Sequence, residues 1–202
     1  MKIILASASP RRKDLLKQIG LDFEVLPAQG EELTTRTAPC EVVVELAEKK
    51  AEEIYEKAVV NENAKQDILV IGADTIVAYG NRILGKPKDE DDAGHILSML
   101  SGNTHEVYTG VSLWIRENGE TFRHSFYEKT EVTMYPIRKQ EAEAYVKSGE
   151  PMDKAGSYGI QGLGARFIRR INGDYNNVVG LPIGRIYQEF LQLGIDISCN
   201  SL

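Results

Sequence analysis

Apolar residues recur along this chain with two different spacings, and the two spacings predict a protein of alternating strands and helices. Runs rich in β-branched residues predict strands over residues 2–7, 23–26, 68–78, 104–116, 121–134 and 167–171, with a short return strand before residue 85. Stripes at helical spacing predict helices over residues 10–19, 41–55, 89–100, 138–147 and 183–193. Asn118-Gly119 is a strong hairpin signal between two strands, and the polar residues 60–67 are expected to form a loop.

One of these strands carries a carboxylate in an otherwise apolar run. Residues 68–78 read as a strand buried on both faces, and Asp74 lies at its centre. A buried carboxylate is costly unless it is paired or binds a cation. Gly72 lets another group approach the backbone closely. Two interpretations stay open at this point: a functional Asp74, or a core carboxylate satisfied by a turn or an arginine.

The first helix begins with a feature that favours an anion. Ser9 is placed to cap it and Pro10 suits its first position. Arg11 and Arg12 then fall in the first turn, where the helix dipole already favours negative charge. We interpret this end as an anion site at the carboxyl end of a strand, where open α/β sheets bind ligands. The alternative is that both guanidiniums extend to solvent.

A lysine falls on the apolar side of the second predicted helix. Lys50 lies three residues after Ala47 and four before Ile54, within the stripe that faces the core. Lysine is rarely buried unless it is paired. Lys50 is therefore expected to reach an anion inside the protein, with an internal salt bridge as the equally weighted alternative.

A glycine-rich loop is predicted over residues 151–164. Its four glycines suggest backbone arranged closely around a ligand. Gln161 offers both an acceptor and a two-proton donor, which suits the edge of a nucleobase. Lys86 ends a Gly-x-x-x-x-Gly-Lys sequence, but Pro87 replaces the hydroxyl residue of a P-loop and no helix opens there, so a P-loop is rejected. Lys86 is kept as a point charge for phosphate.

Composition narrows the class of protein. The 202 residues suffice for one large α/β domain or two small lobes. The net charge of −6 argues against nucleic acid as a partner, because duplex binding needs a basic surface. Cys40 and Cys199 have no metal-ligand spacing and read as free thiols of a reducing compartment. The apolar start is too short for a signal peptide, and no run is long enough for a membrane helix, so a cytoplasmic protein is expected.

Taken together, several motifs resemble the Maf family of nucleoside triphosphate pyrophosphatases, in the family's order and over nearly the whole chain. The matching stretches are Ser7-x-Ser9-Pro10-Arg11-Arg12, the helix of Lys50, Gly72-Ala73-Asp74-Thr75, Gly85-Lys86-Pro87, Asp153-Lys154-Ala155-Gly156, Tyr158-Gly159-Ile160-Gln161-Gly162 and Val179-Gly180-Leu181-Pro182. The resemblance implies one elongated α/β domain over residues 1–202. It implies a long twisted mixed sheet flanked by helices, with a central cleft, as in inosine triphosphate pyrophosphatases.

The resemblance also implies a substrate. Arg11, Thr75 and Gln161 stand at the positions typical of the branch that hydrolyses dTTP and UTP to the monophosphate and pyrophosphate, rather than the branch acting on 7-methyl-GTP. These three residues would select the pyrimidine. Ser7 and Ser9, which precede Arg11 in the same motif, would contribute to substrate binding.

The chemistry implied by the resemblance centres on Asp74 as proton acceptor. A divalent cation, Mg²⁺ or Mn²⁺, would lie between Asp74 and an acidic residue of the loop that follows the second strand, either Glu32 or Glu31. Arg12, Lys50 and Lys86 would neutralise the phosphates. Whether Asp74 acts as base, as metal ligand or as both stays open.

Two other interpretations compete with a dTTP and UTP pyrophosphatase. The family name is linked to septum formation and division arrest, so the chain could regulate cell division by binding rather than by catalysis. Alternatively, its main substrates could be modified nucleotides. The exposed face expected of the hairpin around residues 118–119 makes a homodimer plausible.

Overall fold

The computed structural model describes residues 1–61 and 66–195. Its strands are β1 (Lys2–Leu5), β2 (Glu24–Val25), β3 (Ile68–Tyr79), β4 (Arg82–Leu84), β5 (Thr104–Glu117), β6 (Glu120–Met134) and β7 (Ile168–Asn172). Its α-helices are α1 (Pro10–Gln18), α2 (Pro39–Asn61), α3 (Glu90–Leu100), α4 (Lys139–Lys147), α5 (Tyr175–Val179) and α6 (Ile183–Gln192). The glycine-rich loop contains three 3₁₀ turns: η1 (Glu150–Asp153), η2 (Ala155–Ser157) and η3 (Gly162–Phe167).

Most predicted elements are confirmed, with shifted ends. α2 is longer than the predicted 41–55 because Pro39 is tolerated in its first turn and a Glu53–Lys57 pair, four residues apart, supports its last turns. The predicted loop 60–67 is therefore wrong at residues 60 and 61, while 62–65 lie outside the described residues. Cys199 also lies outside them, and Cys40 is a free thiol.

The strands form a mixed sheet, which confirms the α/β class. Their order is β2-β1-β3-β5-β6-β7, and β4 pairs with β3. β1 runs parallel to both β2 and β3, whereas β3–β4 and β6–β7 are antiparallel. Asn118 and Gly119 have φ values of 52° and 84°, the two positive φ angles that a type I′ hairpin turn requires. The predicted hairpin between β5 and β6 is thus confirmed.

The chain forms two compact units. Unit 1 consists of Met1–Asp74, Thr109–Tyr127 and the chain from Gly180 onward, and unit 2 consists of Thr75–Tyr108 and Glu128–Val179. Strands β3, β5 and β6 contribute residues to both units. That all 202 residues act as a single domain remains a prediction.

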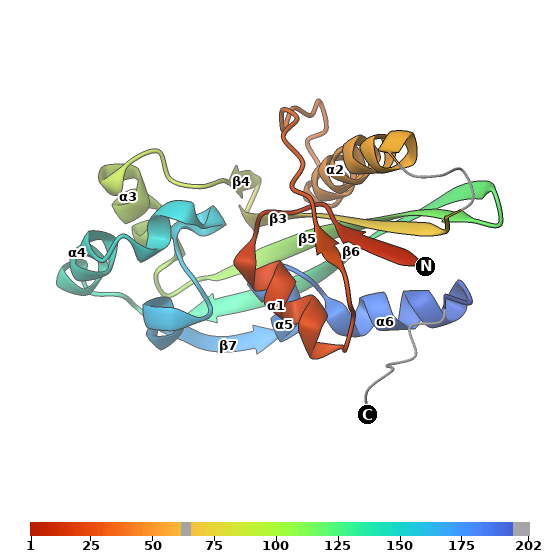
Figure 1. Ribbon diagram of the computed structural model, residues 1–202. Coiled ribbons are helices and arrows are strands. Elements are labelled where there is room, and N and C mark those ends of the chain that lie inside the picture. Colours follow the sequence, from red (N-terminus) through yellow and green to blue (C-terminus); the bar gives the residue numbers. More distant parts are fainter. Residues whose placement is uncertain (62–65, 196–202) are drawn as a thin grey trace. The chain divides into compact units, whose positions relative to one another are not determined.

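In unit 1, helix α2 packs directly onto the backbone of β3 and β5 (Figure 1). A Cβ on Gly72 would lie 2.4 Å from the carbonyl oxygen of Ala47, and one on Gly110 would lie 2.2 Å from that of Val43. Both glycines are therefore needed for the close approach of α2. Strand β6 contacts helix α6 through His124, whose Nε2 lies 2.8 Å from Glu189 Oε2.

We expect Gly72→Ala to lower the free energy of unfolding by about 1–3 kcal/mol, because the new methyl group has no space beside α2. Urea unfolding followed by circular dichroism measures the change. Gly94→Ala is the matched control, since a Cβ there meets nothing within 4 Å and alanine favours the helix α3. Equal stability of the two variants would contradict the close packing of α2 on β3.

Unit 2 has its own hydrophobic core. This core is formed by the portions of the sheet strands that belong to unit 2, together with α3, α4 and the 3₁₀ turns. Leu97, Leu100 and Tyr145 are fully buried there. His105 lies in the same interior, with Nε2 2.7 Å from the Tyr158 hydroxyl. Burial lowers the pKa of His105 to about 4, so the ring is neutral near pH 7. A buried neutral ring that pairs with a tyrosine hydroxyl is consistent with a structural role for this histidine.

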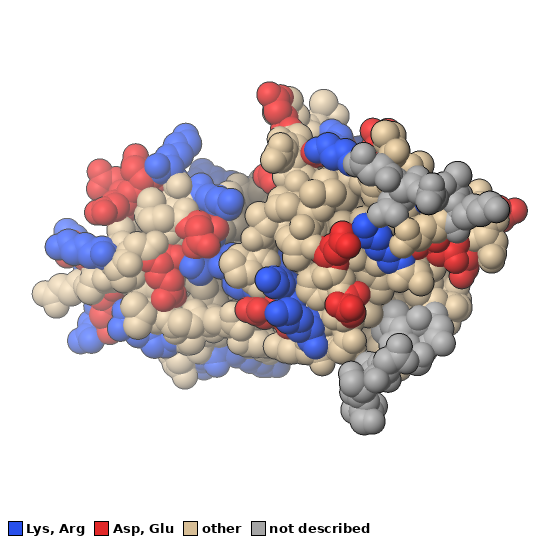
Figure 2. Space-filling model, in the orientation of Figure 1, with Lys and Arg blue, Asp and Glu red and all other residues tan. Residues whose placement is uncertain are grey.

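The surface shown in Figure 2 carries interspersed basic and acidic side chains rather than one broad basic patch. Among the helices of the described residues, none combines the length and apolar character that a membrane span requires. The distribution of surface charge on this face does not mark an anion site.

Candidate active site

The buried carboxylate of β3 is paired with the lysine of α2. Lys50 Nζ lies 2.6 Å from Asp74 Oδ1 and 2.6 Å from Glu32 Oε1. Asp74 and Lys50 are largely buried, whereas Glu32 is mostly exposed. One ammonium group therefore joins a buried carboxylate to a carboxylate on a surface loop. This contact is the internal salt bridge that the sequence left open as an alternative for Lys50. It also brings the carboxylates of Asp74 and Glu32 to the same ammonium group.

The backbone explains why Lys50 reaches Asp74. Side chains two residues apart on a strand share a face, so Gly72 and Asp74 both face α2. Because Gly72 has no side chain, α2 approaches β3 closely at Ala47 and Ala51. Lys50 lies on the same part of the helix, beside the carboxylate. The glycine predicted to allow a close approach thus serves to pair these two residues.

Arg12 is tied to the same strand from α1. Its Nη1 donates to the Ala73 carbonyl at 2.8 Å and to Ser7 Oγ at 3.2 Å, and its Nε donates to the Gly180 carbonyl at 2.9 Å. The alternative in which Arg12 simply extends to solvent is therefore wrong. Burial lowers the pKa of its guanidinium, while the negative charge of Asp74 opposes that shift. Arg12 supplies positive charge next to Asp74.

The start of α1 is built as the sequence predicts. Ser9 has an extended backbone, and its side-chain oxygen accepts the Arg12 N–H at 3.5 Å, which confirms the N-cap. The Ser9 N–H donates to Ser7 Oγ at 3.3 Å. Arg11 lies in the same first turn and is partly buried. Ser7, Ser9, Arg11 and Arg12 thus surround one helix N-terminus beside β1 and β3 in unit 1.

The acidic pair fits a divalent cation in its donor chemistry. Glu32 and Asp74 present hard carboxylate oxygens that already contact one shared positive group. Within the described part of the chain, no cluster of three or more His, Cys, Asp or Glu residues is placed to hold a metal. The two carboxylates fit Mg²⁺, which commonly takes one or two protein carboxylates and completes its shell with substrate phosphates and water. Of the two acids considered in the sequence, Glu32 makes the contact with Lys50.

The remaining predicted residues belong to unit 2. Thr75 follows Asp74 on β3 and is partly buried, with its side chain on the other face of the strand. Lys86 is exposed in the loop after β4. Gln161 is exposed, directly before η3. These three residues stand in a different unit from Asp74.

A buried tyrosine and a glutamate fix the backbone on both sides of Gln161. The Tyr145 hydroxyl accepts the Gly159 N–H at 3.1 Å and donates to Glu150 Oε1 at 2.9 Å. Glu150 also accepts the N–H groups of Leu163 at 2.8 Å and Gly164 at 3.0 Å. Residues 159 and 163–164 are thereby held to α4 and η1. Gln161 is presented to solvent from a loop with a defined backbone.

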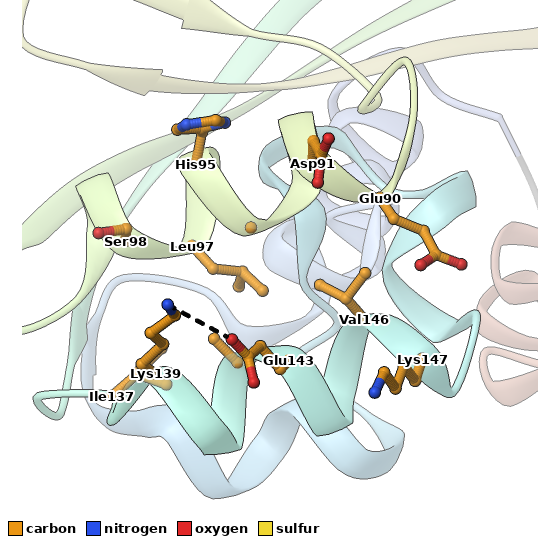
Figure 3. A pocket seen from close by; sticks show the side chains of 12 residues that line it. Glu90, Asp91, His95, Leu97, Ser98, Ile137, Lys139, Glu143, Val146 and Lys147 are labelled. Carbon is orange, nitrogen blue, oxygen red and sulfur yellow. Dashed lines mark ion pairs between the residues drawn. The ribbon is translucent and has the colours of Figure 1, made fainter.

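A groove of about 740 Å³ lies between α3 and α4 in unit 2 (Figure 3). Its lining includes Glu90, His95, Lys139, Glu143 and Lys147, and Lys139 Nζ lies 3.8 Å from Glu143 Oε1. None of the residues predicted to bind substrate lines it. The groove carries charges of both signs, and the candidate active site is elsewhere.

Sequence reasoning missed two parts of this arrangement. Nothing in the local sequence connects Tyr145 and Glu150 with the backbone at residues 159–164, because these hydrogen bonds depend on tertiary structure. Helix α5 was also missed, although Asp174 Oδ1 accepts the Asn176 N–H at 2.8 Å and is a recognisable N-terminal signal.

Comparison with known proteins decides the family. A family model described as "Maf-like protein" matches residues 2–193. The chain belongs to the Maf family. The resemblance drawn from the motifs is thereby confirmed over nearly the whole chain.

Two relatives of this Maf protein are both named dTTP/UTP pyrophosphatase. The chain is 59% identical over 203 residues to a dTTP/UTP pyrophosphatase of Agathobacter rectalis, covering 97% of this chain and 99% of that protein. It is 48% identical over 197 residues to a dTTP/UTP pyrophosphatase of Lachnoclostridium phytofermentans, covering 97% of each. A solved nucleoside-triphosphatase / dITP/XTP pyrophosphatase structure from Mycobacterium abscessus aligns with 96% of this chain and 94% of its own, at 14% identity and a TM-score of 0.40.

Proposed function

We propose that this Maf protein hydrolyses dTTP and UTP to the nucleoside monophosphate and pyrophosphate, using a divalent cation. The observation that carries the proposal is the buried Asp74 carboxylate, paired with Lys50 and linked through it to Glu32. The names of the two relatives supply the substrates. The cytoplasmic location expected from the sequence accords with a free nucleotide substrate.

The residues of unit 1 suit an attack of water on the α-phosphorus. Asp74 accepts a proton from that water, an oxygen–phosphorus bond forms, and the bond from the α-phosphorus to the bridging oxygen breaks. Pyrophosphate leaves with the bonding electrons. Lys50 and Arg12 oppose the negative charge that accumulates on the phosphate oxygens.

Glu32 and Asp74 would hold the cation, which would polarise the phosphates and lower the pKa of bound water. Lys50, which contacts both carboxylates in the structure, is assigned to a phosphate oxygen of the substrate. Lys86, as an exposed point charge of unit 2, is assigned to phosphate, and Arg11, Thr75 and Gln161 are assigned to the base. Ser7 and Ser9, whose hydroxyl oxygens accept backbone N–H groups at the start of α1, are assigned to substrate binding.

Product analysis tests the bond that is cleaved. With UTP in ¹⁸O-labelled water, we expect ³¹P NMR to show UMP and pyrophosphate, with the label in UMP. Formation of UDP and orthophosphate would overturn the proposed reaction. A label in pyrophosphate would place the attack on the β-phosphorus and would contradict the proposed reaction as well.

We expect Gln161→Ala to relax the choice of base. The ratio of kcat/KM for UTP over CTP is expected to fall about tenfold or more, because a site that hydrogen-bonds the base rejects a mismatched edge by leaving polar groups unpaired. Steady-state pyrophosphate release with each nucleotide measures the ratio. Gln140→Ala, an exposed glutamine on α4, is the control and is expected to leave the ratio unchanged. An unchanged substrate profile in Gln161→Ala would refute the role of Gln161.

A further inference from the structure

The loop that carries Glu32 is attached to α2 by a residue outside the proposed reaction. Residues 26–38 contain no regular helix or strand. Glu53 accepts the Gln29 N–H on both carboxylate oxygens, at 3.0 and 3.1 Å, and the Gly30 N–H on Oε2 at 2.9 Å. Two successive backbone donors of the loop therefore converge on one carboxylate.

Further contacts hold this attachment in place. Lys57 Nζ donates to Glu53 Oε1 at 2.6 Å, one turn along the helix. A Cβ on residue 30 would lie 3.1 Å from Glu53 Oε2, so glycine allows the backbone to come this close. At the other end of the loop, Lys49 Nζ donates to the Leu33 carbonyl at 2.7 Å. The loop is thus attached to α2 both before and after Glu32.

Three residues of α2 contact the loop, and their partners follow one another in the sequence of the loop. Glu53 holds residues 29 and 30, Lys50 contacts Glu32 at 2.6 Å, and Lys49 holds residue 33. Glu32 itself is mostly exposed, and its side chain would sample many rotamers on an unattached loop. Fixing the backbone on both sides lowers the entropy that Glu32 loses when it binds a cation.

We propose that Glu53 is a positioning residue that holds the 29–30 backbone so that Glu32 can bind a divalent cation together with Asp74. The proposal rests on the proposed function, since it assigns Glu32 to the cation. Glu53 contacts neither substrate nor the reacting atoms in this scheme. It acts through the loop, as residues that orient a metal ligand commonly do.

Cation binding without catalysis tests the proposal directly. Mn²⁺ alone is titrated into the full chain and free Mn²⁺ is followed by electron paramagnetic resonance. Glu53→Ala is expected to raise the dissociation constant roughly tenfold to a hundredfold, the range found when a group orienting a metal ligand is removed. Glu53→Gln keeps one acceptor oxygen and is expected to give an intermediate value. Glu52→Ala, an exposed acid one residue away that loses the same charge, is expected to bind as the parent does.

Activity and exchange measurements separate positioning from general destabilisation. In Glu53→Ala the Mg²⁺ concentration for half-maximal pyrophosphate release is expected to rise about tenfold, while kcat recovers at saturating Mg²⁺. Hydrogen exchange of the Gln29 and Gly30 amides is expected to accelerate. A lowered melting temperature with unchanged Mn²⁺ and Mg²⁺ dependence would overturn the positioning role. Parent protein that releases no pyrophosphate would instead refute the proposed function, independently of the Mn²⁺ result.

Discussion

Asp74→Asn is expected to lower kcat for dTTP and UTP by about a thousandfold or more while leaving the protein folded. The amide has nearly the same shape as the carboxylate but neither accepts a proton from water nor provides the second negative charge for a cation. Lys50 keeps Glu32 as its partner, so the substitution does not strand an unpaired ammonium group. Coupled pyrophosphate detection measures turnover, and circular dichroism measures the fold.

Two variants that remove acidic groups from the loop help to interpret the result for Asp74→Asn. Glu32→Gln removes the acid that contacts Lys50, whereas Glu31→Gln removes its neighbour on the same loop. We expect Glu32→Gln to weaken the response to Mg²⁺ and Glu31→Gln to stay within about twofold of the parent. Near-normal hydrolysis by Asp74→Asn would end the assignment of the active site. A larger loss in Glu31→Gln than in Glu32→Gln would move the second ligand to Glu31.

Arg12→Lys is expected to damage both stability and activity, although the charge is kept. Arg12 donates to the carbonyls of Ala73 and Gly180 from different nitrogens of one planar group, and a lysine ammonium cannot reproduce that fork. Leaving one of these partly buried carbonyls unpaired costs about 1–3 kcal/mol. Because Ala73 precedes Asp74, we also expect kcat/KM to fall at least about tenfold.

Chemical unfolding and steady-state kinetics test the Arg12 prediction together. Lys13→Ala is the control on the same helix, because Lys13 is exposed and its loss removes a charge without breaking the fork. Its free energy of unfolding is expected to change by about 0.5 kcal/mol or less. Parent-like stability in Arg12→Lys would show that the fork does not hold β3 and α1 together.

The sequence predicts well those features that depend on neighbouring residues. Ser9 and Pro10 identify the start of α1, Asn118-Gly119 identifies the hairpin, and the apolar run around Asp74 identifies β3 as a buried strand. In each case the chemistry that selects the structure lies within a few residues. The charged residues that break these patterns, Asp74 and Lys50, were for the same reason visible as candidates for a site.

Long-range contacts could not be predicted in the same way. The sequence marks Asp74 and Lys50 separately, but the pair forms because Gly72 admits α2 to the backbone of β3. Glu53 lies on the polar part of its helix and has no local feature that links it to residues 29 and 30. Such hydrogen bonds join segments more than twenty residues apart and are determined by tertiary packing.

The proposed function is the metal-dependent release of pyrophosphate from dTTP and UTP. The most direct test is pyrophosphate release by the parent protein from dTTP, UTP, CTP, GTP, ATP and 7-methyl-GTP, each with Mg²⁺, with Mn²⁺ and with EDTA. We predict rapid release from dTTP and UTP that EDTA abolishes and the metal restores. Release that persists in EDTA, a preference for 7-methyl-GTP, or no release from any of the six nucleotides would contradict the account.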